Sequence, residues 1–304
     1  MPAQIPYDEF AYFADNASEF GIPYEGPPTV RRERYEIEPG RALSALVWGS
    51  GAPQLVFLHG GAQNAHTWDT VALALDRPLI AIDLPGHGHS DAPRTSSVDV
   101  RDNAADVATV IRAAAPDASA VIGMSLGGMT SIALAAAAPE LVRSLVLVDV
   151  TPGVNQDKSR AISDFINGPE SFPSFDDILA RTIEHNPTRT EASLRRGILH
   201  NAKQRPDGSW VWRYARFRTP GTAGAAPAHP DFSSLWDDVS GLTMPVLLVR
   251  GMRPQSVVDD ADEAELLRRL PTARVERVQE AGHSVQGDTP VELARLIDDF
   301  APAP

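Results

Sequence analysis

The stretch "SAVIGMSLGG", residues 119–128, determines how the rest of the chain is interpreted. An apolar run leads into Gly-x-Ser-x-Gly at residues 123–127, and a helical pattern follows from 128 to 138. Between a strand and a helix, this motif indicates a nucleophile elbow, a strained turn that exposes the serine hydroxyl. Side chains on either flank would clash with the turn, which explains the glycines. We predict that Ser125 is a catalytic nucleophile; the alternative is a merely tight turn.

Short apolar runs and helical patterns alternate on both sides of this stretch. Residues 31–39 and 42–49 are typical of an antiparallel pair at a sheet edge. Further strands are expected at 53–60, 78–86, 144–150, 244–251 and 273–283, and helices at 98–115, 259–270 and 290–300. This alternation predicts an α/β fold with a mostly parallel central sheet flanked by helices.

The interval 152–240 interrupts the alternation. It has helical periodicity around 174–203, a segment with two tryptophans at 208–217, and a Gly-, Ala- and Pro-rich run at 218–230. We therefore predict a core formed by residues 1–151 and 241–304, with 152–240 as a helical cap insertion. Open α/β sheets bind ligands at the C-terminal ends of their strands, so the cap is expected there.

A second motif, "FLHGGAQNAHTW" at residues 57–68, follows a predicted strand directly. Acyl transfer develops negative charge on a carbonyl oxygen, which two preorganised backbone N–H groups can stabilise. The N–H groups of Gly61 and Leu126 are the candidates for this oxyanion hole. His59 is expected to brace the loop and to transfer no proton.

A third motif, "QEAGHSVQGDTPVEL" at residues 279–293, contains His283 between the last predicted strand and the last helix. His283 is thus expected at the same end of the sheet as Ser125. We predict that it is the general base; the alternative is a structural loop histidine.

Together, the serine elbow, the His-Gly-Gly loop, "DLPGHGHSD" at 83–91 and the late "AGH" resemble the α/β-hydrolase fold superfamily. The resemblance covers about residues 40–152 and 240–300, and it implies a serine hydrolase with a Ser-His-acid triad. The alternate spacing of His87 and His89 is typical of the family's loop and is not interpreted as a metal pair. No metal or cofactor is expected.

Members of this superfamily usually take the triad acid from the loop that here reads "GMRPQS", residues 251–256, which holds no carboxylate. One replacement is Asp259, Asp260 or Asp262, although acids at these positions are also typical of a helix start. The other is Asp149 at the end of the strand 144–150, where some relatives, including many haloalkane dehalogenases, place the acid. We favour Asp149; a dyad without an acid is the third alternative.

Composition excludes several classes of protein. The chain of 304 residues has 27 Lys and Arg against 40 Asp and Glu, a net charge of −13, which argues against nucleic acids or anionic membranes as partners. It has no cysteine, so disulfides, thiolate metal sites and Cys nucleophiles are excluded. The first 20 residues lack the pattern of a secretory signal, and no apolar run is long enough to span a membrane. We expect a cytoplasmic protein; the sequence leaves its oligomeric state open.

These features predict hydrolysis of a small, moderately apolar carboxylic ester or lactone through an acyl-enzyme. A serine nucleophile argues against dehalogenase and epoxide hydrolase chemistry, which needs an aspartate. Hydrolysis of a C–C or amide bond at the same site is one alternative, and a non-catalytic ligand-binding protein is another. Met124 and Trp68 are expected to line the substrate pocket, whereas Trp210, Trp212 and Trp236 suit the pocket or the core of the cap equally.

Overall fold

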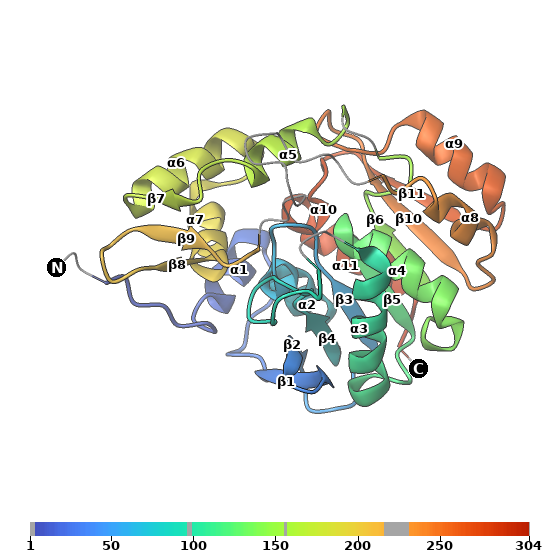
Figure 1. Cartoon of the computed structure of the whole chain (residues 1–304), viewed down its shortest axis with the longest axis horizontal. Helices are drawn as coiled ribbons and strands as arrows, with labels where there is room; N and C mark the ends of the chain where they lie inside the picture. The colour runs from blue at the N-terminus through green and yellow to red at the C-terminus, as the bar shows by residue number, and fades with distance from the viewer. Residues whose placement is uncertain (1–3, 96–98, 155–156, 216–230, 304) are drawn as a thin grey trace.

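An eight-stranded sheet forms the centre of the computed structural model, which describes residues 4–95, 99–154, 157–215 and 231–303 (Figure 1). The strand order is β1-β2-β4-β3-β5-β6-β10-β11. The strands are β1 (Val30–Glu38), β2 (Arg41–Trp48), β3 (Leu55–Leu58), β4 (Leu79–Ile82), β5 (Ala120–Met124), β6 (Leu145–Val148), β10 (Val246–Gly251) and β11 (Arg274–Val278). β2 pairs antiparallel with β1 and with β4, and all other pairs are parallel. The predicted α/β class and the antiparallel edge pair are confirmed.

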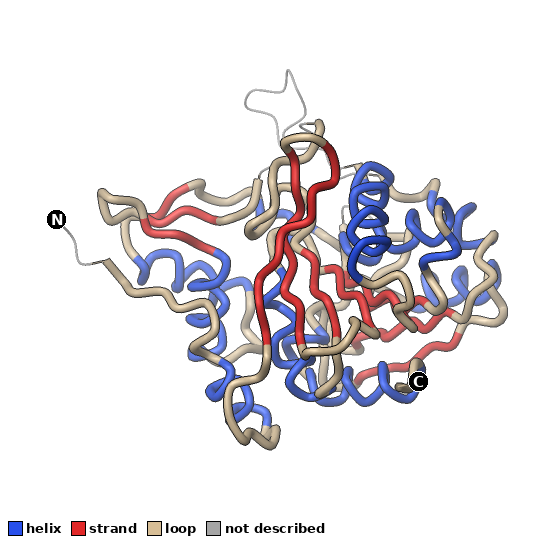
Figure 2. The backbone as a smooth tube through the Cα atoms, turned by 90° about the horizontal axis from the view of Figure 1, so that it is seen from below, coloured by secondary structure: helices blue, strands red, loops and turns tan. Residues whose placement is uncertain are grey.

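Helices cover both faces of this sheet (Figure 2). One face carries α3 (Val100–Ala114), α4 (Leu126–Ala137), α8 (Leu235–Ser240) and α9 (Asp260–Arg269). The other carries α1 (Phe13–Phe20), α2 (Asp69–Leu75) and α11 (Pro290–Phe300). Short helical turns lie at η1 (Ala65–Trp68), η2 (Pro139–Leu141) and α10 (Val285–Asp288). Because β3 to β6 and most of β10 are buried on both faces, they appear in the sequence as continuous apolar runs.

The insertion forms a separate layer beside the ends of the strands (Figure 1). It contains α5 (Arg160–Ile166), β7 (Ser171–Phe172), α6 (Phe175–His185), α7 (Glu191–Asn201), β8 (Ala202–Gln204) and β9 (Trp210–Trp212). Helices α6 and α7 match the periodicity predicted around 174–203, whereas α5 was not predicted. The insertion also holds a three-stranded sheet in the order β7-β9-β8, which was not predicted either. Strands of two or three residues are too short to leave a pattern in the sequence.

The C-terminal end of the predicted cap, residues 218–240, includes a helix of the core and a run that the structure does not describe. Helix α8, which the prediction assigned to the cap, packs in the main core through Leu235, Trp236 and Val239. The predicted irregular run at 218–230 falls on residues 216–230, which lie outside the described residues. No helix in the described part of the chain is both long enough and apolar enough to cross a bilayer.

Candidate active site

Ser125 occupies the turn between β5 and α4 with φ 51° and ψ −117°. A non-glycine residue in this region of backbone space costs on the order of 1–3 kcal/mol, and such strain is typical of functional turns. The turn is closed by two glycines. A Cβ on Gly123 would lie 2.5 Å from the carbonyl oxygen of Gly127, and one on Gly127 would lie 2.2 Å from that of Leu58. The close packing of α4 against β3 and β5 therefore holds Ser125 in its elbow.

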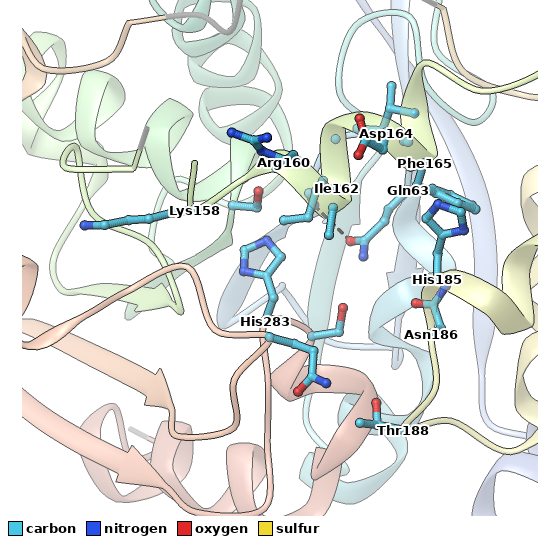
Figure 3. Close-up of a pocket in the computed structure, with 18 of the residues that line it drawn as sticks. Gln63, Lys158, Arg160, Ile162, Asp164, Phe165, His185, Asn186, Thr188 and His283 are labelled. Atoms are coloured by element: carbon cyan, nitrogen blue, oxygen red, sulfur yellow. Dashed lines mark hydrogen bonds between the residues drawn. The ribbon is translucent and has the colours of Figure 1, made fainter. Parts of the chain in front are cut away.

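His283 lies in the loop after β11, and its imidazole projects into a cavity that Ser125 also lines (Figure 3). Its Nδ1 lies 2.9 Å from Oδ2 of Asp149. A carboxylate can only accept, so Nδ1 carries the proton and Nε2 carries the lone pair. Nε2 is buried and has no hydrogen-bond partner among the described residues. The imidazole is thus held in the tautomer that can accept a proton from the cavity.

Asp149 follows β6 directly and is fully buried, with φ 45°. Besides His283, three groups donate to its carboxylate: the N–H of Gly251 (2.9 Å), the hydroxyl of Ser256 (2.6 Å) and the N–H of Val257 (3.1 Å). All three belong to the end of β10 or the loop that follows it. The loop in which the resemblance led us to look for the acid therefore supplies the donors for Asp149.

The other candidates for the acid, Asp259, Asp260 and Asp262, form contacts away from His283. Asp259 caps α9 by accepting from the N–H of Asp262, and both carboxylates pair with Lys158 at 2.8 and 2.6 Å. Asp260 is exposed and pairs with Arg250 at 2.7 Å. Within the described residues none of them contacts His283, whereas Asp149 does.

The loop after β3 brings its backbone close to the elbow. A Cβ on Gly60 would lie 2.5 Å from Sδ of Met124 and 3.2 Å from Cβ of Ser125, whereas one on Gly61 would meet nothing closer than 3.8 Å. The N–H of Gly60 donates to the side-chain oxygen of Gln63 at 3.0 Å. The N–H of Gly61 has no acceptor in the described part of the chain, and Leu126 is the first residue of α4, where N–H groups lack an intrahelical acceptor. Both predicted oxyanion donors are therefore free to bind an oxygen.

His59 braces this loop through two hydrogen bonds. Its Nδ1–H donates to the carbonyl of Gly60 (2.7 Å), and its Nε2 accepts from the N–H of Leu84 (2.9 Å). Burial lowers the pKa of His59, although the charge of Asp83 and the bond to Gly60 oppose this shift. Because both ring nitrogens of this neutral imidazole form hydrogen bonds, His59 fixes the loop and has no nitrogen left for proton transfer.

The cavity above Ser125 has a volume of about 520 Å³. Loops of the core line one side, and α5 with the linker between α6 and α7 lines the other (Figure 3). Met124 lies in its wall, as predicted. Charged side chains also line it: Asp157, Lys158, Arg160, Asp164, Arg189 and Asp288.

The prediction that Trp68 faces substrate is wrong. Its side chain is buried in the core and packs on Phe57, because residues 65–68 form the short helix η1 that turns back toward the sheet. Trp210 belongs to the small core of the cap, and Trp236 to the main core. Trp212 packs against the cap core and lines a second, smaller cavity.

Sequence reasoning missed two side chains that shape the site. Ser256 was seen only as a residue that cannot be an anion, yet it donates to Asp149. Gln63 was not singled out, yet it holds the N–H of Gly60. The signal for Ser256 was its position, since it stands where the acid of relatives is expected.

A buried cluster of His66, Asp69 and His200 has the spacing of metal ligands, with its ligand-type atoms within 4.8 Å of one another. Linear spacing did not reveal it, because His200 comes from the cap. Nδ1 of His66 lies 2.8 Å from Oδ2 of Asp69. Nε2 of His66 lies 3.3 Å from the guanidinium of Arg32. His200 of the cap stacks on the ring of His66 with 3.8 Å between the ring centroids, so in this structure the cluster is a packed contact between cap and core.

The α/β-hydrolase fold family matches residues 53–290. The chain belongs to this family. It is 46% identical over 298 residues to the esterase Rv0045c of Mycobacterium tuberculosis, covering 95% of this chain and 94% of the relative. A crystal structure of that esterase superposes with a TM-score of 0.82 at 44% identity, covering 98% and 99% of the two chains.

A second relative is more distant. The 2-(acetamidomethylene)succinate hydrolase of Mesorhizobium japonicum is 31% identical over 272 residues, covering 88% of this chain and 94% of the relative. A structure of E-2-(acetamidomethylene)succinate hydrolase superposes with a TM-score of 0.75 at 28% identity, covering 90% and 100%. These comparisons confirm the prediction of an esterase-like hydrolase of this family. The role of each side chain stays a prediction.

Proposed function

We propose that the chain hydrolyses a small carboxylic ester or lactone by two-step acyl transfer, with Ser125, His283 and Asp149 as its triad. The observation that carries the proposal is the buried hydrogen bond between His283 and Asp149, which leaves Nε2 without a partner in the cavity that Ser125 lines. The 46% identity to an esterase along nearly the whole chain supports the same reaction class.

In the first step, Oγ of Ser125 attacks the ester carbonyl while its proton passes to Nε2 of His283. The carbonyl oxygen becomes an oxyanion that accepts from the N–H groups of Gly61 and Leu126. Each such donor contributes roughly 3–4 kcal/mol to lowering the barrier. The C–O bond then breaks, and His283 returns the proton to the departing alcohol.

In the second step, water attacks the acyl-enzyme and gives its proton to Nε2 of His283. The second tetrahedral intermediate collapses, the acid leaves, and the proton returns to Oγ of Ser125. Asp149 stabilises the imidazolium in both steps and holds the ring in one tautomer.

Turnover of p-nitrophenyl acetate tests the proposal. The wild-type protein is expected to hydrolyse it, and Ser125→Ala to lower kcat by at least about 10⁴-fold with an unchanged Tm. A burst of p-nitrophenol equal to the enzyme concentration would report the acyl-enzyme. Absence of turnover, combined with a ligand that raises the Tm, would support a binding protein instead.

Amide hydrolysis is a second candidate, because one relative at 31% identity is named for a substrate with an acetamido group. The two reactions use the same site. Matched ester and anilide substrates with one acyl group separate them: an amide hydrolase would cleave the anilide with a kcat/KM close to that of the ester.

A further inference from the structure

Arg189 lies at the end of the linker between α6 and α7 and lines both the cavity above Ser125 and a neighbouring cavity of about 190 Å³. Its guanidinium donates to the hydroxyl of Ser193. Among the residues that the structure describes, no carboxylate lies within ion-pair distance of it. Arg189 is partly buried, and an arginine at the wall of a cavity without a counter-ion is unusual, because charges withdrawn from water are normally paired.

The other cations of these two walls are paired. Lys158 contacts Asp259 and Asp262, Arg160 lies 2.7 Å from Asp157, and Arg196 pairs with Glu19. Arg189 therefore stands apart from the other lysine and arginine side chains that line either cavity.

Nearby acids do not neutralise it. Burial lowers the pKa of Arg189, and the charges of Asp288 and Glu19 only partly oppose this shift. Asp288 is already occupied: Oδ2 accepts from the N–H of Gly282 at 2.9 Å, and Oδ1 accepts from the hydroxyl of Thr188 at 3.1 Å. The guanidinium thus remains without an anion that would offset its desolvation.

The region around Arg189 is polar. The two cavities share a wall that includes Gln63, Asn186 and Arg189. In the smaller cavity, Nε2 of His200 and Oε1 of Gln286 are buried and have no hydrogen-bond partner within the described residues. A polar group of a bound molecule fits this end of the cavity better than an alkyl chain does.

We propose that Arg189 binds a free carboxylate of the substrate, so that the enzyme prefers esters that carry a carboxylate remote from the scissile bond. This inference rests on the proposed esterase function. The planar guanidinium matches a carboxylate with two parallel hydrogen bonds. A monoanion suits the site better than a dianionic phosphate, because Asp288 and Glu19 would repel the second charge.

The test compares charged and neutral esters of equal size. Monoethyl esters of the dicarboxylic acids from succinate to suberate are assayed beside the matching ethyl ester amides, in which a primary amide replaces the carboxylate. A second pair, 4-acetoxybutyrate and its amide, places the carboxylate on the alcohol side. In at least one pair, the wild-type kcat/KM for the ester with the carboxylate is expected to exceed that for its amide partner by on the order of 10- to 100-fold. This is the range that a hydrogen bond between charged groups provides.

Arg189→Met is expected to abolish this preference and to keep the turnover of the neutral amide partner, while Arg189→Lys retains part of it. Arg195→Met is the control, because Arg195 lies on α7 only six residues further along the chain, is exposed, and pairs with Glu191. Equal rates for charged and neutral partners in wild type, or a preference that survives Arg189→Met, would overturn the inference. Failure of the esterase proposal is distinct, since p-nitrophenyl acetate would then not turn over either.

Discussion

His283 and Asp149 are joined by a 2.9 Å hydrogen bond across the end of the sheet, although 134 positions separate them in the chain. Asp149 follows β6, which pairs with β10; β10 in turn pairs with β11, and His283 follows β11. The acid thus reaches the histidine from two strands away. The loop of the intervening strand closes over the carboxylate and donates to it.

Asp149→Asn is the sharpest test of this arrangement. An amide cannot hold the imidazole in the required tautomer or stabilise the imidazolium, so kcat is expected to fall by roughly 10⁴-fold. Esterase kinetics beside circular dichroism measure the effect on a folded protein.

Asp259→Asn and Asp260→Asn are the matched controls. Both are expected to stay near wild-type kcat, because these acids pair with Lys158 and Arg250 and do not contact His283. If one of them loses activity while Asp149→Asn retains it, the assignment of the acid is wrong.

Ser256→Ala removes the shortest hydrogen bond to Asp149, at 2.6 Å. A hydrogen bond to a charged group contributes about 1.5–3 kcal/mol, so we expect kcat/KM to fall about 10-fold or more as the carboxylate loses support.

Ser209→Ala provides the comparison for Ser256. Its hydroxyl also donates to a carboxylate at 2.6 Å, that of Asp207, but in a turn of the cap. The kcat/KM of Ser209→Ala is expected to equal that of wild type. Equal effects of the two substitutions would mean that Ser256 acts on stability alone.

The sequence predicted the sheet well because its central strands are buried on both faces and flanked by glycine or proline. It led to Asp149 by exclusion, since the usual loop has no carboxylate. It did not reveal Ser256 as a donor, because that contact joins residues 107 positions apart. Trp68 was misplaced for a related reason: whether an aromatic side chain turns toward the cavity or the core depends on a single turn of η1, which the local pattern does not specify.

The hydrogen-bonded cluster around His66 predicts a pH dependence of stability. Burial alone would lower the pKa of His66, but the charge of Asp69 and hydrogen bonds to Asp69 and Glu9 raise it to about 9. The folded state therefore holds this proton more tightly than the unfolded state. This stabilisation is fully present below about pH 6.5 and is lost as the pH rises toward 9.

Urea unfolding of wild type and His66→Gln at several pH values measures this contribution. The free energy of unfolding of wild type should fall more steeply than that of the variant between about pH 6.5 and 9. Asp69→Asn should flatten the curve as well, because it removes the charge that raises the pKa of His66. Parallel curves for wild type and His66→Gln would contradict a buried, charged His66.

Two glycines in helices should respond oppositely to alanine. Gly127, in the first turn of α4, has no room, because a Cβ would lie 2.2 Å from the backbone oxygen of Leu58. Gly197, in the middle of α7, has nothing within 4 Å of the added Cβ. Alanine is favoured over glycine in a helix by about 1 kcal/mol, so Gly197→Ala should raise the Tm by a few degrees.

Gly127→Ala should lower the Tm and reduce esterase activity. The added Cβ forces the backbone of α4 away from that of β3, and this movement displaces the elbow that holds Ser125. Differential scanning calorimetry with p-nitrophenyl acetate kinetics measures both. A Gly127→Ala protein with wild-type Tm and kcat would show that the close approach of α4 to β3 is not needed to position the nucleophile.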